Sequence, residues 1–381
     1  MIEDNSIYIY ILWAKSRHKQ SLLIDKISTR FQILAVYEIK WSNENFYKNL
    51  KRFYGTKLND VDKKIQEIGK EPFLLLVIHD KNPIFEKRRT SLGMEIVNVN
   101  IFNFKKYLRK LLDNGFLIHS SLNFRESNED LTMLLGKNLK DLKYIFSQKW
   151  DGKFIQINND LVGSDGWINA QNLFYVLNSL NDYVVLRNFE NLDCISKYSH
   201  DDIDILTNDI GKIPYHCNGG KSLFDKYFTK QIKIENKLIN LDFLYPGDNY
   251  YDPKWYRDIL NHKILKNGIF VPSDEDYFFT LLYHSLKIRK ELPLEYKNKL
   301  IELNQKLDLR FQNFSDIPYL IDSLEKYMKF KGYLDTNSII FRLKNIKPIY
   351  YLKFSISIWK NHGFRFLVNV INNKFNKIFS R

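Results

Sequence analysis

Apolar and acidic residues alternate one by one near the middle of the chain, over residues 202–206. Ile203 and Ile205 hold the apolar positions, and Asp202 and Asp204 hold the acidic ones. A period of two residues is typical of a strand that has one face in the core. The pattern therefore predicts a strand whose isoleucines face the core and whose carboxylates project from the other face, roughly 6–7 Å apart.

Two more strands are expected on either side of this one along the chain. The apolar run 183–186 predicts a strand that ends at Arg187 and Asn188. Residues 239–245 predict another, in which Asp242 lies between apolar neighbours. Together these strands indicate a small sheet with acidic residues on one face.

The first part of the chain predicts an α/β module over residues 1–150. Strands are expected over residues 7–13, 31–39, 72–79 and 116–118, with helices over 20–31, over 43–54 with Asn43 as N-cap, and from Ser127 or Asn128 to Gly136. Residues 72–79 are apolar almost throughout, which is typical of a central parallel strand buried on both faces. Alternating strands and helices favour a layered α/β architecture.

Turn-forming residues over 148–166 predict a linker after this module. Beyond it we expect an α+β domain over residues 160–290 and a helical C-terminal region over 291–381. Their helices are predicted over residues 167–180, 255–266 and 277–286, the last after a capping box at Ser273.

The segment 331–381 carries ten Lys and Arg against one acid, with apolar residues on one helical face. These apolar residues are Phe364, Leu367, Val368, Ile371, Phe375 and Ile378. A basic amphipathic helix can lie on an anionic membrane surface. Docking of the same helix on the body of the protein is an equal alternative.

Composition narrows the class of protein. The net charge of +14 favours anionic partners. Cys194 and Cys217 are the only cysteines, which predicts a reducing compartment. No secretory signal is visible, and no apolar run reaches the roughly 18–20 residues that a membrane-spanning helix needs. We therefore expect a cytoplasmic protein, with peripheral contact to the inner membrane as an option for the tail.

The acidic pair predicts a metal site. Like charges repel unless a cation or a proton lies between them. Carboxylate oxygens a short distance apart suit Mg²⁺ or Mn²⁺, which keep some waters and bridge to substrate phosphates. Asp202 and Asp204 are therefore candidate metal ligands.

These residues resemble the motif of the nucleotidyltransferase-like superfamily, which has the DNA polymerase beta fold. Asp202 and Asp204 match its acidic-apolar-acidic strand, and Asp242 matches its third acid. Leu186-Arg187-Asn188-Phe189 stands where a small Gly-Ser motif is usual, and it looks like the Leu-Arg variant of uncharacterised members. The resemblance covers residues 165–290. It is nearest the bacterial surface-polysaccharide branch, with phosphocholine-transferase and fukutin-related proteins as distant relatives.

The resemblance implies a transferase in which Asp202, Asp204 and Asp242 are the catalytic residues and hold Mg²⁺ or Mn²⁺. A phosphate-linked group or a sugar would move from a nucleotide-activated donor to a glycan or lipid-linked acceptor, in capsule or lipopolysaccharide assembly. Arg187, with Asn188 beside it, would contact a donor phosphate, since an arginine fork binds phosphate bidentately.

Other polar sets are candidates for substrate binding. Lys87, Arg88 and Arg89 follow a predicted strand and would clamp a phosphate or carboxylate, unless they form a solvated loop. His119, Asn123 and Glu126 would form a polar site, unless they support the helix beside them. Asp248, Tyr250 and Tyr251 would bind or stack on a sugar or base, unless these rings serve packing.

Two other functions remain open. A glycosyltransferase could use the same acidic pair to hold a nucleotide-sugar, with the pair at the end of a strand in a larger Rossmann-like sheet. A non-enzymatic nucleic-acid-binding protein would explain the positive charge. No known nucleic-acid-binding motif is apparent, so a specific nucleic-acid partner is not expected.

Overall fold

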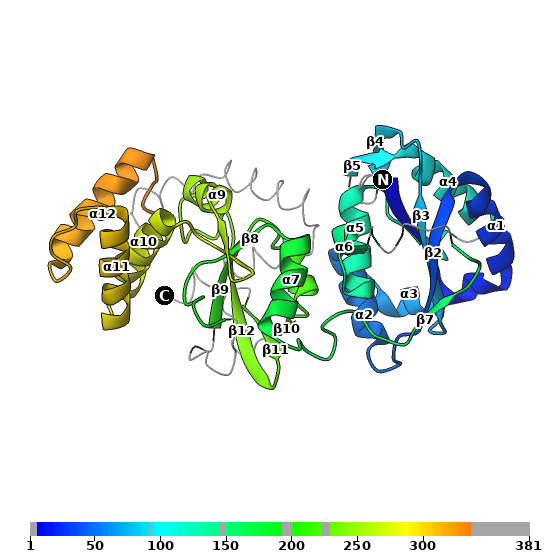
Figure 1. Cartoon of the computed structure of the whole chain (residues 1–381), viewed down its shortest axis with the longest axis horizontal. Helices are drawn as coiled ribbons and strands as arrows, with labels where there is room; N and C mark the ends of the chain where they lie inside the picture. Colours follow the sequence, from blue (N-terminus) through cyan, green and yellow to red (C-terminus); the bar gives the residue numbers. More distant parts are fainter. Residues whose placement is uncertain are drawn as a thin grey trace. The chain divides into compact units, whose positions relative to one another are not determined.

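The computed structural model describes residues 6–90, 93–113, 115–142, 144, 146, 150–192, 200, 202–221 and 229–336. The described chain is a mixed α/β structure that divides into two compact units (Figure 1). The first contains the described residues up to Asp165 together with Tyr215–Asn218. The second contains Gly166–Pro214 and the described chain from Gly219 onward. Each unit has a five-stranded sheet.

The sheet of the first unit has the strand order β6-β1-β3-β2-β7. These strands are β6 (Ile118–Ser120), β1 (Ile7–Leu12), β3 (Phe73–His79), β2 (Gln32–Ile39) and β7 (Ile155–Ile157). The central position of β3 is as predicted, but the parallel direction predicted for it is wrong. It runs antiparallel to both β1 and β2. Both of its faces are buried, and that burial produces an apolar sequence whichever way the neighbouring strands run.

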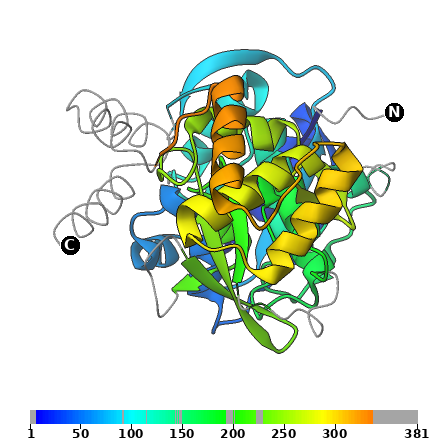
Figure 2. The ribbon, with the colours of Figure 1, turned by 90° about the vertical axis from the view of Figure 1, so that its left-hand side faces the viewer.

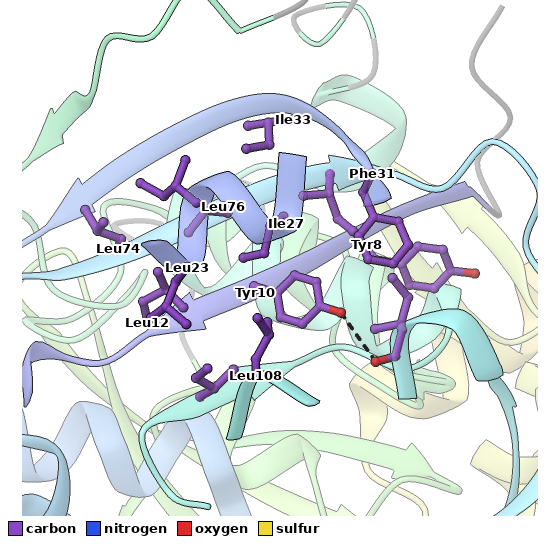
Figure 3. Packing of buried hydrophobic residues seen from close by; sticks show 14 of the residues in the cluster. Tyr8, Tyr10, Leu12, Leu23, Ile27, Phe31, Ile33, Leu74, Leu76 and Leu108 are labelled. Atoms are coloured by element: carbon purple, nitrogen blue, oxygen red, sulfur yellow. Dashed lines mark hydrogen bonds between the residues drawn. The ribbon is translucent and has the colours of Figure 1, made fainter. Parts of the chain in front are cut away.

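Helices α1 (Gln20–Arg30) and α4 (Val99–Leu111) supply the core on one face of this sheet. In Figure 3, Tyr10 of β1 lies among Leu76 of β3, Ile27 of α1 and Leu108 of α4. The Tyr10 hydroxyl donates a hydrogen bond to the carbonyl oxygen of Ile101 at 3.3 Å. This bond satisfies the one polar atom that the ring brings into the core.

Aromatic side chains fill another part of the first unit. Trp13 packs against Phe73 of β3 at 4.7 Å and against Trp41 at 5.9 Å between ring centroids. Phe46 of α2 (Phe46–Tyr54) packs on Trp41 at 5.3 Å.

The first unit has several other elements. They are the 3-10 helices η2 (Ala14–Lys19) and η3 (Gly55–Lys57), helices α3 (Val61–Ile68), α5 (Phe124–Leu135) and α6 (Leu139–Leu142), and the hairpin β4 (Phe85–Thr90) and β5 (Gly93–Asn98).

Two helix starts in the first unit differ from prediction. Asn45, not Asn43, is the N-cap residue of α2. The α5 helix begins at Phe124, because the side chain of Asn123 accepts a hydrogen bond from the backbone N–H of Glu126 at 2.9 Å. Gly136 ends α5 in the left-handed conformation, as predicted.

The sheet of the second unit has the order β10-β11-β12-β9-β8. Its strands are β10 (Gly220–Lys221), β11 (Thr229–Ile234), β12 (Lys237–Leu244), β9 (Asp202–Thr207) and β8 (Tyr183–Val185). β9 and β12 run parallel, and the other neighbouring pairs run antiparallel. Helix α7 (Ala170–Leu180) precedes β8, as predicted, with Asn169 as its N-cap.

The short helix α8 (Ile213–His216) contains the boundary between the two units, which falls after Pro214. The other elements of the second unit follow the sheet along the chain. They are α9 (Pro253–Asn261), the hairpin β13 (Ile264–Lys266) and β14 (Ile269–Val271), α10 (Asp274–Tyr283), the π-helical turn η6 (His284–Arg289), α11 (Leu294–Leu307) and α12 (Ile317–Lys331). Helix α10 contacts both α11 and α12, which appear in yellow and orange in Figure 2.

The helix predicted to reach Lys266 ends at Asn261 instead. Residues 264–266 enter the hairpin β13–β14, whose turn contains Asn267 and Gly268. Both have positive φ, 50° and 79°. An Asn-Gly pair favours this kind of tight turn, so the local turn signal outweighs the helical spacing. The predicted cap of the next helix is confirmed, since the side chain of Ser273 accepts a hydrogen bond from the backbone N–H of Asp276.

Residues 337–381, which hold most of the predicted basic tail, lie outside the described residues. Within the described ranges, none of the helices is both long and apolar enough to cross a membrane.

Candidate functional site: an acidic face on the second sheet

The predicted alternation in β9 is confirmed. Ile203 and Ile205 are fully buried, while Asp202 is exposed and Asp204 is half-buried. The neighbouring strand β12 is parallel to β9 and places Asp242 directly beside Asp204. The three predicted carboxylates therefore share one face of the sheet, on two adjacent strands.

Strand β11 extends this acidic face by two side chains. Thr229 lies opposite Asp242, and Gln231 lies opposite Asn240. Because Asn240 is also beside Asp202, the register gives two rows of three residues across β11, β12 and β9. One row is Thr229, Asp242 and Asp204, and the other is Gln231, Asn240 and Asp202. We call these six residues the acidic face.

The carboxylates of the acidic face repel one another. Burial raises the pKa of Asp202, and the charge of Asp204 raises it further. Burial also raises the pKa of Asp242. The hydroxyl of Thr229, which donates to Asp242 Oδ1 at 2.6 Å, lowers that pKa, and the charges of Asp204 and Asp202 raise it again. Part of the rise in both pKa values comes from the neighbouring carboxylates, so the acids of this face repel one another.

Arg187 lies directly after β8 and binds Asp204. Its Nε and Nη2 atoms lie 3.1 and 2.7 Å from Asp204 Oδ2, and its side chain is only 3% exposed. The fork that was expected to reach a donor phosphate is thus occupied by a protein carboxylate. Asn188, the other residue expected at the donor phosphate, has φ of 56°, a left-handed conformation that asparagine tolerates better than most residues. Its position is consistent with a role in the turn after β8.

A tyrosine contacts the remaining nitrogen atom of the Arg187 guanidinium, and a histidine contacts that tyrosine. Arg187 Nη1 donates to the Tyr250 hydroxyl at 3.4 Å, and this hydroxyl also contacts Nδ1 of His284. Burial, with the charges of Arg187 and Arg289, lowers the pKa of His284 to about 3, so its ring is neutral at pH 7. Burial raises the pKa of Tyr250 to about 12, so the phenol stays protonated. Its O–H donates a hydrogen bond to Nδ1 of His284.

A divalent cation suits the acidic face in charge and in donor type. Across the described residues, no group of three or more His, Cys, Asp or Glu side chains is already arranged to hold a metal ion. Asp204 is paired with Arg187. Burial and the neighbouring acids raise the pKa values of Asp202 and Asp242, and Asn240 Oδ1 is buried with no hydrogen-bond partner among the described residues. Carboxylate and amide oxygens are the ligands that Mg²⁺ and Mn²⁺ prefer.

The basic candidates in the first unit lie on the β4–β5 hairpin, not in a loop. Lys87 and Arg89 project from one face of β4, and Arg88 projects from the other, where its Nη2 lies 2.6 Å from Glu86 Oε2. Because a strand alternates its side chains, the three residues do not converge on one ligand in the way a clamp requires.

The structure brings His119 and Glu126 into one charged cluster of the first unit. His119 Nε2 lies 2.9 Å from Asp130 Oδ2, and Lys57 Nζ lies 3.4 Å from Glu126 Oε1. Asn123 caps α5, and Glu126 Oε2 accepts a hydrogen bond from the backbone N–H of Leu122. The contacts of Asn123 and Glu126 thus support the helix start, which is the structural alternative for this set.

The candidates after β12 have mainly packing contacts. Asp248 accepts hydrogen bonds from the backbone N–H groups of Tyr245 and Tyr250 at 3.0 and 2.7 Å, so it organises a turn. Tyr251 is 1% exposed and packs against Trp255 at 5.1 Å between ring centroids. A ring buried to this degree is not open to a sugar or base. Tyr250 accepts a hydrogen bond from Arg187, as described above.

Sequence reasoning missed Thr229, Asn240 and His284. Asn240 stands two residues before Asp242, so the period of two could have placed both on one face. No sequence signal gives the register that brings Thr229 to Asp242, because that register depends on strand pairing. His284 lies about 80 residues beyond the acidic pair in sequence, and only the fold brings it to Arg187.

Comparison of the chain with models of known protein families, with curated proteins and with solved structures gives no match.

Proposed function

We propose that the chain is a transferase of the nucleotidyltransferase-like superfamily, with Mg²⁺ or Mn²⁺ held on the acidic face. The observation that carries the proposal is the register of β9 and β12, which puts Asp204 and Asp242 side by side with Asp202 on the same face. Three acids on adjacent strands are the arrangement that the sequence motif implies. The substrates would be a nucleotide-activated donor and a glycan or lipid-linked acceptor, in bacterial surface-polysaccharide assembly.

In this proposal Asp202 and Asp242 are the principal ligands, with Asn240 beside them. A bound divalent cation would neutralise charge on the transferred phosphoryl group. Arg187 then serves as a positioning residue, because it fixes one oxygen of Asp204 and leaves the other free. Tyr250 accepts a hydrogen bond from Arg187 and is itself in contact with His284.

Asp242 is the candidate general base. An ionised carboxylate within reach of an acceptor hydroxyl can take its proton as the hydroxyl oxygen attacks. The acceptor oxygen would bond to the donor phosphorus, the bond from phosphorus to the leaving group would break, and the hydroxyl proton would pass to Asp242. The Thr229 hydroxyl donates to Oδ1 of Asp242 and so orients this carboxylate.

The architecture favours this proposal over a glycosyltransferase with the same acidic pair. Such an enzyme was expected to place the pair at the end of a strand in a larger Rossmann-like sheet. Here the sheet has five strands with one parallel pair, and Asp204 lies inside β9.

The test combines cation binding with a donor screen. Mn²⁺ binding to the full chain is measured by electron paramagnetic resonance, and a set of nucleotides and nucleotide-sugars is screened for transfer with and without EDTA. Asp202→Asn and Asp242→Asn should each weaken Mn²⁺ binding by about tenfold or more and abolish transfer, because each removes a charged ligand. Glu302→Gln, which changes an exposed acid on α11, is the matched control.

Two results would count against the proposal. The first is Mn²⁺ binding that is as strong in both aspartate variants as in the control. The second is transfer activity that survives EDTA.

A further inference from the structure

The β4–β5 hairpin of the first unit carries its apolar and basic side chains on one face. Figure 1 shows β4 and β5 in cyan, as a ribbon separate from the main sheet of this unit. The register pairs Lys87 with Ile96 and Arg89 with Met94. Phe85 follows on the same face, two residues before Lys87. We call these five residues the hairpin face.

Every residue of the hairpin face is exposed. The exposed fractions are 46% for Phe85, 59% for Ile96 and 67% for Met94, and the adjoining Ile84 is 52% exposed. Large apolar side chains gathered at this exposure mark an interaction surface more often than chance. The first unit has a well-filled core elsewhere, so these residues are not needed for its packing.

The two faces of the hairpin differ in charge. Lys87 and Arg89 are the charged residues of the hairpin face, and neither acid of the two strands lies there. Glu86 and Glu95 project from the opposite face, where Arg88 pairs with Glu86 at 2.6 Å. The hairpin face therefore presents two positive charges beside three apolar side chains, and both acids of the two strands lie on the opposite face.

We propose that the hairpin face binds an anionic lipid surface. Phe85, Met94 and Ile96 would enter the boundary between headgroups and acyl chains, and Lys87 and Arg89 would meet lipid phosphates. Long basic side chains can keep their charged ends at that level while their stems lie along apolar groups. This contact is separate from the acidic face and does not depend on the function proposed for it.

The chemistry of the hairpin face favours lipid over nucleic acid. A β-ribbon that reads a nucleic acid needs side chains that hydrogen-bond to base edges. Phe85, Met94 and Ile96 offer none, whereas an apolar medium would cover them. An acidic protein would satisfy Lys87 and Arg89, but the apolar residues lie on a two-stranded ribbon and would need a deep complementary groove.

Vesicle flotation of the full chain tests the proposal. One vesicle set is phosphatidylcholine alone, and the other contains phosphatidylcholine with phosphatidylglycerol. We expect binding to the anionic vesicles that weakens with added salt. Lys87→Gln/Arg89→Gln should lower the partition coefficient by about 30-fold, because each basic residue near the lipid surface contributes a factor of roughly five. Phe85→Ser/Ile96→Ser should lower it at least as much, through lost apolar burial.

Lys63→Gln/Lys70→Gln is the matched control, because it removes two positive charges from exposed positions at and after α3. This control should lose less than about threefold in binding, since a general loss of charge acts weakly at a distance. Circular dichroism of all variants verifies that each is folded.

The proposal is overturned if the chain does not bind anionic vesicles. It is also overturned if the hairpin variants bind as well as the control, which would place the membrane contact elsewhere in the chain. Loss of binding to a DNA or RNA oligonucleotide in the hairpin variants, with no vesicle binding in any protein, would assign the face to nucleic acid instead.

Discussion

Arg187 is the residue whose role differs most from expectation. Its guanidinium is 3% exposed, and two of its nitrogen atoms meet one oxygen of Asp204. A buried arginine needs a partner, because an unpaired charge away from water costs several kcal/mol. Asp204 is thus both a candidate ligand and the compensating charge for Arg187. Removal of the Asp204 carboxylate should therefore destabilise the fold as well as the site.

Asp204→Ala should lower the free energy of unfolding by about 3–5 kcal/mol, because it leaves Arg187 buried without its partner. The double variant Arg187→Met/Asp204→Leu removes both charges and should recover most of this loss. Urea unfolding followed by circular dichroism measures both. Glu302→Gln serves as the control, since Glu302 is an exposed acid on α11 away from this pair. A single variant as stable as the wild type would contradict this account of Arg187.

The pairing of β9 with β12 is the element that assembles the acidic face. Each strand by itself carries acids on one side, and parallel pairing in this register puts the two sides together. Burial is the main cause of the raised pKa values of Asp202 and Asp242, and the crowding of the carboxylates raises them further. Strands that tolerate this repulsion are typical of a binding site, where a cation or proton relieves it.

This repulsion predicts how stability depends on pH. A carboxyl whose pKa is raised by folding holds its proton more tightly in the folded state, so it destabilises the fold once the pH exceeds the raised pKa. In EDTA at pH 7, Asp202→Asn should therefore unfold at a slightly higher temperature than the wild type. We expect a gain below about 1 kcal/mol, because solvent screens an exposed group.

The same gain should vanish as the pH falls below the ordinary carboxyl range, where Asp202 is protonated in both states. With Mn²⁺ present at pH 7 the order should reverse, because the wild type gains stability from the bound ion. Differential scanning calorimetry over this pH range measures both effects. A destabilised Asp202→Asn protein in EDTA would contradict the repulsion.

At the scale of the whole molecule, the described chain has two units with separate sheets. The hairpin face belongs to the first unit, and the acidic face belongs to the second. The proposed membrane contact and the proposed cation site therefore lie in different parts of the chain, and each can be tested without the other.

Leu76→Ala tests this separation. Leu76 is fully buried at the centre of β3, so its truncation should destabilise the first unit by about 2–5 kcal/mol. Mn²⁺ affinity at the acidic face should remain within about twofold at 20 °C, since distant sites are usually independent. Leu22→Ala, at a position 43% exposed on α1, is the control for stability. A parallel loss of Mn²⁺ affinity would show that the two units are coupled.

The sequence by itself determined two of the three strands of the acidic face, β9 and β12, and which side chains of β9 share a side. Period-two alternation is a property of one strand, so Ile203 and Ile205 could be assigned to the core, and Asp202 and Asp204 to the opposite face, without knowledge of any neighbour. In the same way, local hydrogen-bonding chemistry fixed the start of α10 at Ser273.

Only the tertiary structure decided what those side chains meet. Strand direction and register depend on contacts between residues far apart in the chain, and an apolar run such as β3 is equally buried by parallel or antiparallel neighbours. Pairing at long range brought Asp242 to Asp204, Thr229 to Asp242 and His284 toward Arg187. Burial of Arg187 beside a carboxylate then turned an expected ligand for phosphate into the partner of an acid, because a buried charge must be paired.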